Sequence, residues 1–228
     1  MARIWAPWCW GVALILLLVG VFWGLFIAPA DYQQKDAYRI IFIHVPVSAM
    51  SMGVYVSMAV ASVIYFVWHI KLAAYFCRSL AVLGTVFTAL ALFTGAVWGK
   101  PMWGTYWSWG DARLLSELIL LFLYLGYIGL ISAIEQERLA DKIGSILLLV
   151  GVINIPVIHY SVVWWNSLHQ GATVLKLGKP AISTEMLIPL LVCLAAFVFF
   201  SAGYALTSVR AKIIEAKNEK ILLSQLHS

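Results

Sequence analysis

Tryptophan is concentrated in two short stretches of this sequence. Residues 98–113 contain four tryptophans and a tyrosine, and a further pair stands at positions 164 and 165. The six tryptophans concerned are Trp98, Trp103, Trp107, Trp109, Trp164 and Trp165. Indole rings stack on a large flat apolar ligand and exclude water from it. These residues therefore predict a binding platform for such a ligand, although tryptophans that only anchor a protein at a membrane surface are the alternative.

Two histidines flank the tryptophan-rich stretches. His44 lies near the start of a long apolar segment, and His169 follows the Trp164-Trp165 pair. If the chain around Trp165 is helical, Trp165 and His169 share a helix face. Neutral imidazole is a common axial ligand of haem iron, so two histidines beside an aromatic platform predict a haem site. His159 is the competing ligand candidate.

The charged residues near these stretches suit the two propionates of a haem. Arg39, Lys100 and Arg113 are the candidate cations. The alternative for Arg113 is an ion pair with Glu117, one helical turn further along. Asp111 has the position and residue type of a helix N-cap. Glu117 is expected partly within lipid, where an acid is by default a candidate functional residue.

The composition indicates a membrane protein. Of 228 residues, 63% are hydrophobic and 11% are charged, whereas soluble domains carry roughly 25% charged residues. No water-soluble core needs this much apolar surface, so the excess is expected to contact membrane lipid. The net charge is +5, but no dense basic run occurs. The basic residues therefore indicate orientation in the membrane and not nucleic-acid binding.

Six apolar segments are long enough to cross a bilayer as helices, which takes about 20 residues each. They run approximately over residues 9–28, 38–68, 79–98, 113–134, 143–163 and 184–207. Only helices and closed barrels satisfy their backbone groups in lipid, and these continuous runs lack the alternation of barrel strands. The sequence predicts an all-α, polytopic membrane protein, with one haem-handling domain over residues 1–228 that includes a basic tail at 208–228.

The distribution of lysine and arginine predicts the orientation. Because the number of spans is even, both termini lie on one side of the membrane. Nine of the 15 basic residues fall on the side of the termini and six on the other, which places both termini in the cytoplasm. Segments 29–38, 98–112 and 164–183 are then at the outer surface, where they hold or adjoin the tryptophans and both candidate ligands.

The first apolar segment also has features of a cleaved signal peptide. Arg3 precedes it, and residues 28–30 resemble a cleavage site. The apolar run at 11–27 is longer than the roughly 7–15 residues of a signal core, so we expect a retained helix. The three cysteines form no C-x-x-C pair, which gives no support to a thiol redox role or to covalent haem attachment.

The segment 98–117 resembles the tryptophan-rich "WWD" signature of haem-handling proteins in cytochrome c biogenesis. The chain as a whole is similar to the cytochrome c maturation protein C (CcmC) family, also called haem exporter protein C. The likeness covers nearly the whole chain apart from the far N-terminus and the tail after about Ser208. The stretches that carry it are 28–34, 44–46, 98–105 and 154–171.

The resemblance implies six helices in the bacterial inner membrane and a haem site that faces the periplasm. It places the two functional histidines of the family on His44 and His169. The family's aromatic motif falls on Trp98, Trp103, Trp107, Trp109 and Asp111. The implied task is non-enzymatic: to present haem b to the haem chaperone CcmE, with the ABC-type proteins CcmA and CcmB and the small membrane protein CcmD as partners.

The sequence departs from the family pattern at two positions. Gly110 stands between Trp109 and Asp111, where the pattern has no residue, and Val163 stands where an acid is expected. A glycine is sterically easy to insert in a loop. We expect it to alter the orientation of Trp109 relative to the fourth helix.

Two other functions are compatible with a haem site of this kind. A b-type cytochrome that moves electrons would bury histidine pairs deep between helices, whereas His44 and His169 are expected at the outer edge. A haem lyase subunit shares the tryptophan signature and attaches haem to apocytochrome. The short chain and the lack of further helices count against it.

Overall fold

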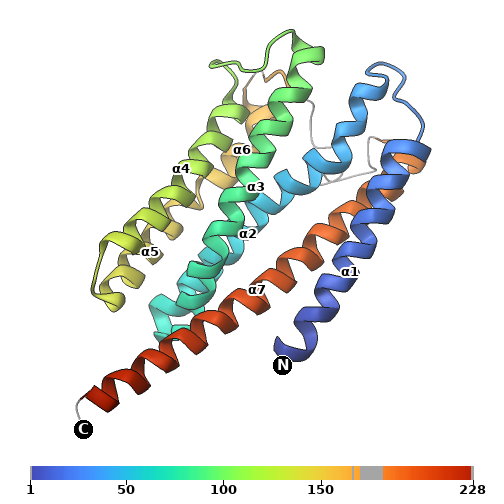
Figure 1. Ribbon diagram of the computed structural model, residues 1–228. Helices are drawn as coiled ribbons and strands as arrows, with labels where there is room; N and C mark the ends of the chain where they lie inside the picture. Colours follow the sequence, from blue (N-terminus) through green and yellow to red (C-terminus); the bar gives the residue numbers. More distant parts are fainter. Residues whose placement is uncertain (1, 166, 170–181, 227–228) are drawn as a thin grey trace.

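The chain forms a bundle of long helices in a computed structural model (Figure 1). The structure describes residues 2–165, 167–169 and 182–226. Within these ranges six helices are long and apolar enough to cross a membrane, and no strand occurs. The prediction of an all-α protein with six spans is therefore confirmed.

Seven α-helices and two short helical turns make up the bundle in the described ranges. They are α1 (Ala2–Phe22), η1 (Trp23–Ile27), η2 (Asp36–Ile40), α2 (Ile41–Trp68), α3 (Lys71–Trp103), α4 (Ala112–Ala133), α5 (Glu137–Gly151), α6 (Asn154–Trp164) and α7 (Thr184–Leu226). The turn η1 extends α1, and η2 leads into α2. Helices α5 and α6 together form the fifth span.

Several helices are longer than the apolar segments that predict them. α1 begins at Ala2, α3 at Lys71 and α5 at Glu137, six to eight residues before the apolar runs start. These extra residues include charged side chains, which a helix accommodates where it leaves the lipid. α7 continues to Leu226, because no glycine or proline follows Gly203 and the residues there favour helix.

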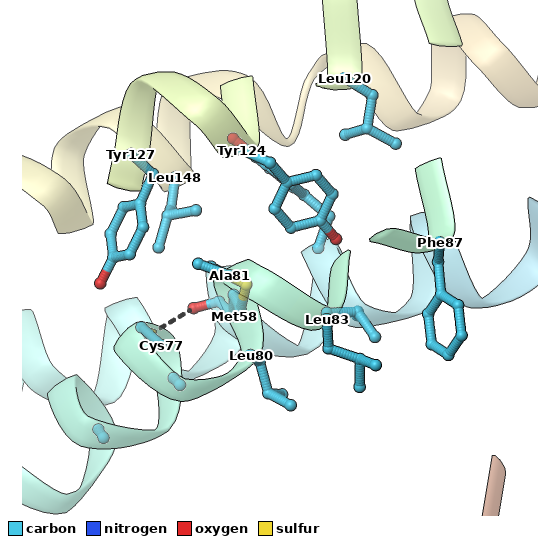
Figure 2. Close-up of a cluster of buried hydrophobic side chains, with 14 of the residues drawn as sticks. Met58, Cys77, Leu80, Ala81, Leu83, Phe87, Leu120, Tyr124, Tyr127 and Leu148 are labelled. Carbon is cyan, nitrogen blue, oxygen red and sulfur yellow. Dashed lines mark hydrogen bonds between the residues drawn. The ribbon is translucent and has the colours of Figure 1, made fainter. Parts of the chain in front are cut away.

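Helix α2 lies at the centre of the bundle. It packs against α3, α5 and α7, while α1 lies along α7 (Figure 1). The main apolar core forms where α2 and α3 meet α4 and α5, and Figure 2 shows part of it. Its fully buried members include Met58 of α2, Ala81 of α3, Leu120 and Tyr124 of α4 and Leu148 of α5.

Close packing of α3 against α4 depends on Gly84. A Cβ atom at this position would overlap the ring of Tyr124. The Tyr124 hydroxyl reaches past α3 and donates a hydrogen bond to the carbonyl of Ser51, at 2.7 Å. One glycine thus lets a tyrosine of α4 connect to α2.

The fifth span is interrupted near its middle. α5 ends at Gly151 and α6 begins at Asn154, so Pro156 lies in the first turn of α6, where a proline is tolerated, and not inside a continuous helix. The Asn154 side chain donates from Nδ2 to the carbonyl of Ser116, at 2.8 Å, and so ties the break to α4. The break sets the direction of α6 and of the chain after it.

We call the end of the bundle where α3 ends and α4 begins the site end. The residues that connect α1 to α2, those that connect α3 to α4, and residues 167–169 all lie there. In Figure 1 the first two connections are at the top. The charge distribution predicts that this end faces the outside of the cell.

Candidate haem site

A pocket at the site end brings together residues from α2, α3, α4 and the segment after α6. Its empty volume is about 360 Å³, including the part open to solvent. The polar residues that line it are His44, Ser48, Arg113, Glu117 and His169. The two candidate iron ligands therefore face one pocket, although 125 residues separate them in the sequence.

His44 is held by α3. Its Nδ1 lies 2.9 Å from the hydroxyl oxygen of Thr94. That hydroxyl donates its own proton to the carbonyl of Leu90, at 2.6 Å, so it accepts the Nδ1 proton of His44. Nε2 then carries the free lone pair. Gly95 gives the ring room, since a Cβ there would lie 3.1 Å from Cε1 of His44.

His169 is held by Asp111. Its side chain is 14% exposed, and its Nδ1 lies 3.3 Å from Oδ1 of Asp111. Burial lowers the pKa of His169 and Asp111 opposes this, while Arg113 adds to the lowering. The net pKa is below the usual value, so the imidazole is neutral at pH 7. Nδ1 faces the Asp111 carboxylate and also lies 3.4 Å from the Ser167 hydroxyl, so Nε2 is left free to bind a metal.

Asp111 has two structural tasks at once. Its Oδ1 accepts from the backbone N–H groups of Arg113 and Leu114, both at 3.0 Å, which confirms the predicted N-cap of α4. Its Oδ2 accepts from the Ser167 hydroxyl at 2.8 Å and from the Leu168 N–H at 2.9 Å. Burial alone would raise the pKa of Asp111, but these hydrogen bonds outweigh burial and lower it. The group is therefore a carboxylate.

Arg39 is already occupied by structural contacts. It donates from one guanidinium nitrogen to the carbonyls of Gly24 and Ala28, at 2.9 and 2.8 Å. Its Nε donates to the carboxylate of Asp36 at 2.9 Å. The guanidinium thus fastens η1 to η2, and three of its five N–H donors are engaged in these contacts.

Arg113 and Lys100 differ in whether their side-chain donors are already engaged by other groups of the protein. Lys100 donates to the carbonyl of Gly104 at 3.0 Å, and its ammonium lies 5.3 Å from the centre of the Tyr106 ring. The half-buried Arg113 lines the pocket, and its guanidinium makes no hydrogen bond or ion pair with any residue that the structure describes. Of the three candidate cations, Arg113 is the one whose donors are free.

The alternative ion pair between Arg113 and Glu117 is not formed in the described part of the chain. The buried Glu117 carboxylate instead accepts from the Ser51 hydroxyl of α2, at 2.8 Å. The side chain of Glu117 points between α4 and α2, where this donor meets it. This contact leaves the Arg113 guanidinium unpaired in the pocket.

Comparison with known proteins assigns the chain. The family model described as "CcmC: Heme exporter protein C" matches residues 1–224. The chain belongs to the CcmC family. The heme exporter protein C of Escherichia coli K12 is 48% identical over 220 residues, which cover 96% of this chain and 88% of that protein. The Haemophilus influenzae protein of the same name is 48% identical over 204 residues, covering 90% and 82%.

A more distant relative comes from a plant. The putative cytochrome c biosynthesis ccmC-like mitochondrial protein of Marchantia polymorpha is 39% identical over 213 residues, 93% of this chain and 88% of that protein. Membership in the CcmC family confirms the resemblance seen in the sequence. It also supports the assignment to haem transport in cytochrome c biogenesis.

Two tryptophans of this CcmC-family protein stand beside the histidines. The Trp98 ring lies 5.5 Å from that of His44, and its Nε1 donates to the side chain of Gln34 at 2.9 Å. The Trp103 ring lies 4.6 Å from that of His169. Each candidate ligand therefore has one indole at its edge.

The next two tryptophans form a pair on the loop between α3 and α4. The rings of Trp107 and Trp109 lie 5.4 Å apart. Trp109 is 73% exposed, and the turn that contains Gly110 directs it away from the core. The Trp107 Nε1 is buried and has no partner among the described residues. A ligand that covered this pair would bury indole surface that is exposed here.

Trp164 and Trp165 do not line the pocket. They are 55% and 50% exposed, and the Trp164 ring stacks on Tyr160 at 5.3 Å. The condition under which Trp165 and His169 would share a helix face is not met, because α6 ends at Trp164. The chain instead turns back onto α4, where Asp111 holds it.

His159 is not a competing ligand in this arrangement. Its ring contacts Tyr160 at 4.8 Å, and it is not among the residues that line the pocket. Residues 166 and 170–181 of the third predicted outer segment lie outside the described residues.

Sequence reasoning missed several residues that shape the site. Thr94 and Gly95 hold and admit the His44 ring, and Ser51 holds Glu117. Small residues within apolar helices give no signal of their own in a single sequence. The position of Thr94 and Gly95 about one turn before Trp98 on α3 was the available hint.

The donors present fit a haem. Two imidazoles that line the pocket offer Nε2, and in both the Nδ1 atom faces an oxygen acceptor. Metal-binding histidines normally have their second nitrogen fixed in this way. One unpaired guanidinium is available for a carboxylate. When bound, haem would supply an iron that takes two nitrogen ligands and propionates that take the cation.

Proposed function

We propose that this protein binds haem b at the periplasmic face of the bacterial inner membrane and presents it to the chaperone CcmE. His44 and His169 are the axial ligands through Nε2. Trp98 and Trp103 pack at the edges of the ligated rings, and the Trp107-Trp109 pair covers the macrocycle. The observation that carries the proposal is that both imidazoles line one pocket with Nδ1 occupied and Nε2 free.

Arg113 is the propionate partner in this proposal. It lines the same pocket and its guanidinium is unpaired within the described residues, whereas Arg39 and Lys100 are engaged elsewhere. A cation with free donors in a half-buried position favours a carboxylate strongly, because charge-assisted hydrogen bonds are the strong ones.

CcmA, CcmB and CcmD complete the proposed assembly. The family name describes haem export, and six long apolar helices suit a component embedded in the inner membrane. The protein's part is to bind, orient and release haem, with no bond-making catalysis assigned to its own residues.

The test compares His44→Ala, His169→Ala and the double variant with His159→Ala as a matched control. Purified protein should show an absorption spectrum of haem with two nitrogen axial ligands, and His159→Ala should retain it. The double variant should lose both the bound haem and the haem transfer to CcmE. Unchanged haem content and transfer in the double variant would refute the ligand assignment.

A further inference from the structure

The two candidate ligands differ in what holds their second nitrogen. The Nδ1 proton of His44 is donated to Thr94, a neutral hydroxyl at 2.9 Å. The Nδ1 of His169 faces Asp111, a carboxylate, at 3.3 Å, and the Ser167 hydroxyl 3.4 Å from Nδ1 donates to the same carboxylate. The Thr94 hydroxyl is uncharged, whereas the Asp111 carboxylate carries a full negative charge. The two imidazoles are therefore polarised to different degrees.

A carboxylate acceptor strengthens an imidazole as a metal ligand. It draws the Nδ1 proton away and raises the electron density at Nε2, and it fixes the plane of the ring. A hydroxyl that already donates to a backbone carbonyl, as Thr94 does to Leu90, polarises the ring much less. On this chemistry His169 is the stronger donor of the two.

The contacts that hold the two histidines in the fold also favour His169 as the stronger ligand. Asp111 holds the segment of His169 through two further hydrogen bonds, from Ser167 and Leu168, at 2.8 and 2.9 Å. The carboxylate thus orients the ring and anchors the chain beside it to the first turn of α4. His44 is held by the Thr94 hydroxyl, a backbone contact with Ala91 and the edge of Trp98, all neutral groups.

We propose that the axial ligands are unequal, with His169 the retained ligand and His44 the one that is exchanged when haem leaves. The proposal rests on the haem site assigned above. In the exchange the iron–Nε2 bond to His44 breaks and a bond to a donor atom of the haem acceptor forms in its place. The number of iron ligands is conserved, and no electron leaves the iron. Asp111 and Thr94 act as positioning residues that set the inequality.

Single-histidine variants test the inequality directly, with free imidazole as the probe. His44→Ala should keep haem through His169 and show a five-coordinate spectrum. Added imidazole should restore the six-coordinate spectrum. His169→Ala should retain less haem than His44→Ala, by a factor of about ten or more. An outer-shell hydrogen bond alone commonly alters metal affinity by roughly 10–100-fold.

The variants Asp111→Asn and Thr94→Val test the cause. Asparagine keeps a side-chain oxygen for the N-cap but removes the charge, so its haem should show a higher midpoint potential and about tenfold faster release. Thr94→Val removes the neutral acceptor of His44 and should change both quantities less than Asp111→Asn does. Asp36→Asn controls for net charge, because it removes an acidic charge from an exposed side chain at the site end. It should leave the midpoint potential and the release rate unchanged. Thermal melting of each apoprotein identifies any loss of folding.

The outcomes separate this proposal from the one it rests on. Equal haem loss in the two single-histidine variants, or an unchanged midpoint potential in folded Asp111→Asn, would overturn the inequality and leave the haem site standing. A wild-type haem spectrum in both histidine variants would instead overturn the haem site itself.

Discussion

At the scale of single residues, the availability of side-chain donors separates the candidates that the sequence presents as equivalent. Arg39, Lys100 and Arg113 are all basic residues near the tryptophans. Arg39 closes the junction between η1 and η2, and Lys100 caps the last turn of α3. Arg113 alone of these three has an unpaired guanidinium in the described structure, and it lies in the pocket with both histidines.

This difference predicts unequal effects of removing the charge. Arg113→Gln should weaken haem binding by about 10–150-fold, because a hydrogen bond to a charged group contributes about 1.5–3 kcal/mol and about 1.4 kcal/mol is tenfold. Haem titration of the purified protein measures the change. Lys100→Gln serves as the matched control and should bind haem as the wild type does. Equal affinities for the two variants would exclude Arg113 as the propionate partner.

At the scale of helices, close contacts between neighbours hold the elements that carry the site. Gly84 lets Tyr124 of α4 approach α3, and the Tyr124 hydroxyl reaches Ser51 of α2. Ser51 in turn donates to Glu117 beneath the pocket. The relative positions of α2, α3 and α4, and hence of both histidines, depend on this packing.

Gly84→Ala should destabilise the protein. The added methyl group would overlap the Tyr124 ring, and overpacking of a core costs about 1–3 kcal/mol. Thermal unfolding in detergent measures the loss. Gly126→Ala on α4 is the matched control: no atom lies within 4 Å of its added Cβ, so its melting temperature should be unchanged or slightly higher. A Gly84→Ala protein as stable as the control would show that α3 and α4 can separate freely.

The opposite end of the bundle is held by an ion pair between α3 and α5. Arg78 donates to Oδ1 of Asp141 from two nitrogens, at 2.7 and 2.8 Å, and the two side chains are 19% and 6% exposed. Removing one member leaves a buried charge without its partner. The pair therefore matters more for α5 than the half-exposed contact of Lys71 with Glu137, whose atoms are 3.9 Å apart.

Arg78→Met should lower the free energy of unfolding by about 3–5 kcal/mol, because Asp141 remains buried and unpaired. The double variant Arg78→Met/Asp141→Leu should recover much of this loss. Lys71→Met should cost less than about 1 kcal/mol, as exposed ion pairs do. Denaturation of the detergent-solubilised variants measures all three. Equal losses for the single and double variants would contradict the account.

At the scale of the whole molecule, the orientation decides whether the pocket faces the periplasm. The pocket lies at one end of the bundle, and the C-terminal part of α7 projects beyond the other helices at the opposite end (Figure 1). The C-terminal part of α7 carries Arg210, Lys212 and Lys217. The positive-inside rule predicts that it is cytoplasmic.

Single cysteines test this orientation. In a Cys9→Ser background the native Cys77 and Cys193 are buried, so a cysteine introduced at an exposed position dominates labelling. Tyr106→Cys at the site end should react with a membrane-impermeant maleimide in intact spheroplasts. Ser224→Cys near the end of α7 should react only after lysis. The reverse pattern would place the pocket in the cytoplasm and exclude presentation of haem at the periplasmic face.

Hydropathy and residue type were enough to predict the spans and the N-cap. Long apolar runs in lipid can only be helices, and Asp111 before an apolar run satisfies backbone donors locally. The two histidines and the crowded tryptophans were recognisable for the same reason, since their chemistry belongs to the residue type. These features depend on neighbours in the chain and on the solvent.

Only the tertiary structure decided which of these residues meet. Asp111 reaches Leu168 and His169 because the break at Asn154 directs α6 and the following chain back onto α4. Thr94 faces His44 because α3 packs against α2. Contacts between residues 50 or more positions apart depend on how several helices pack together, and a single sequence does not encode that packing in any local pattern.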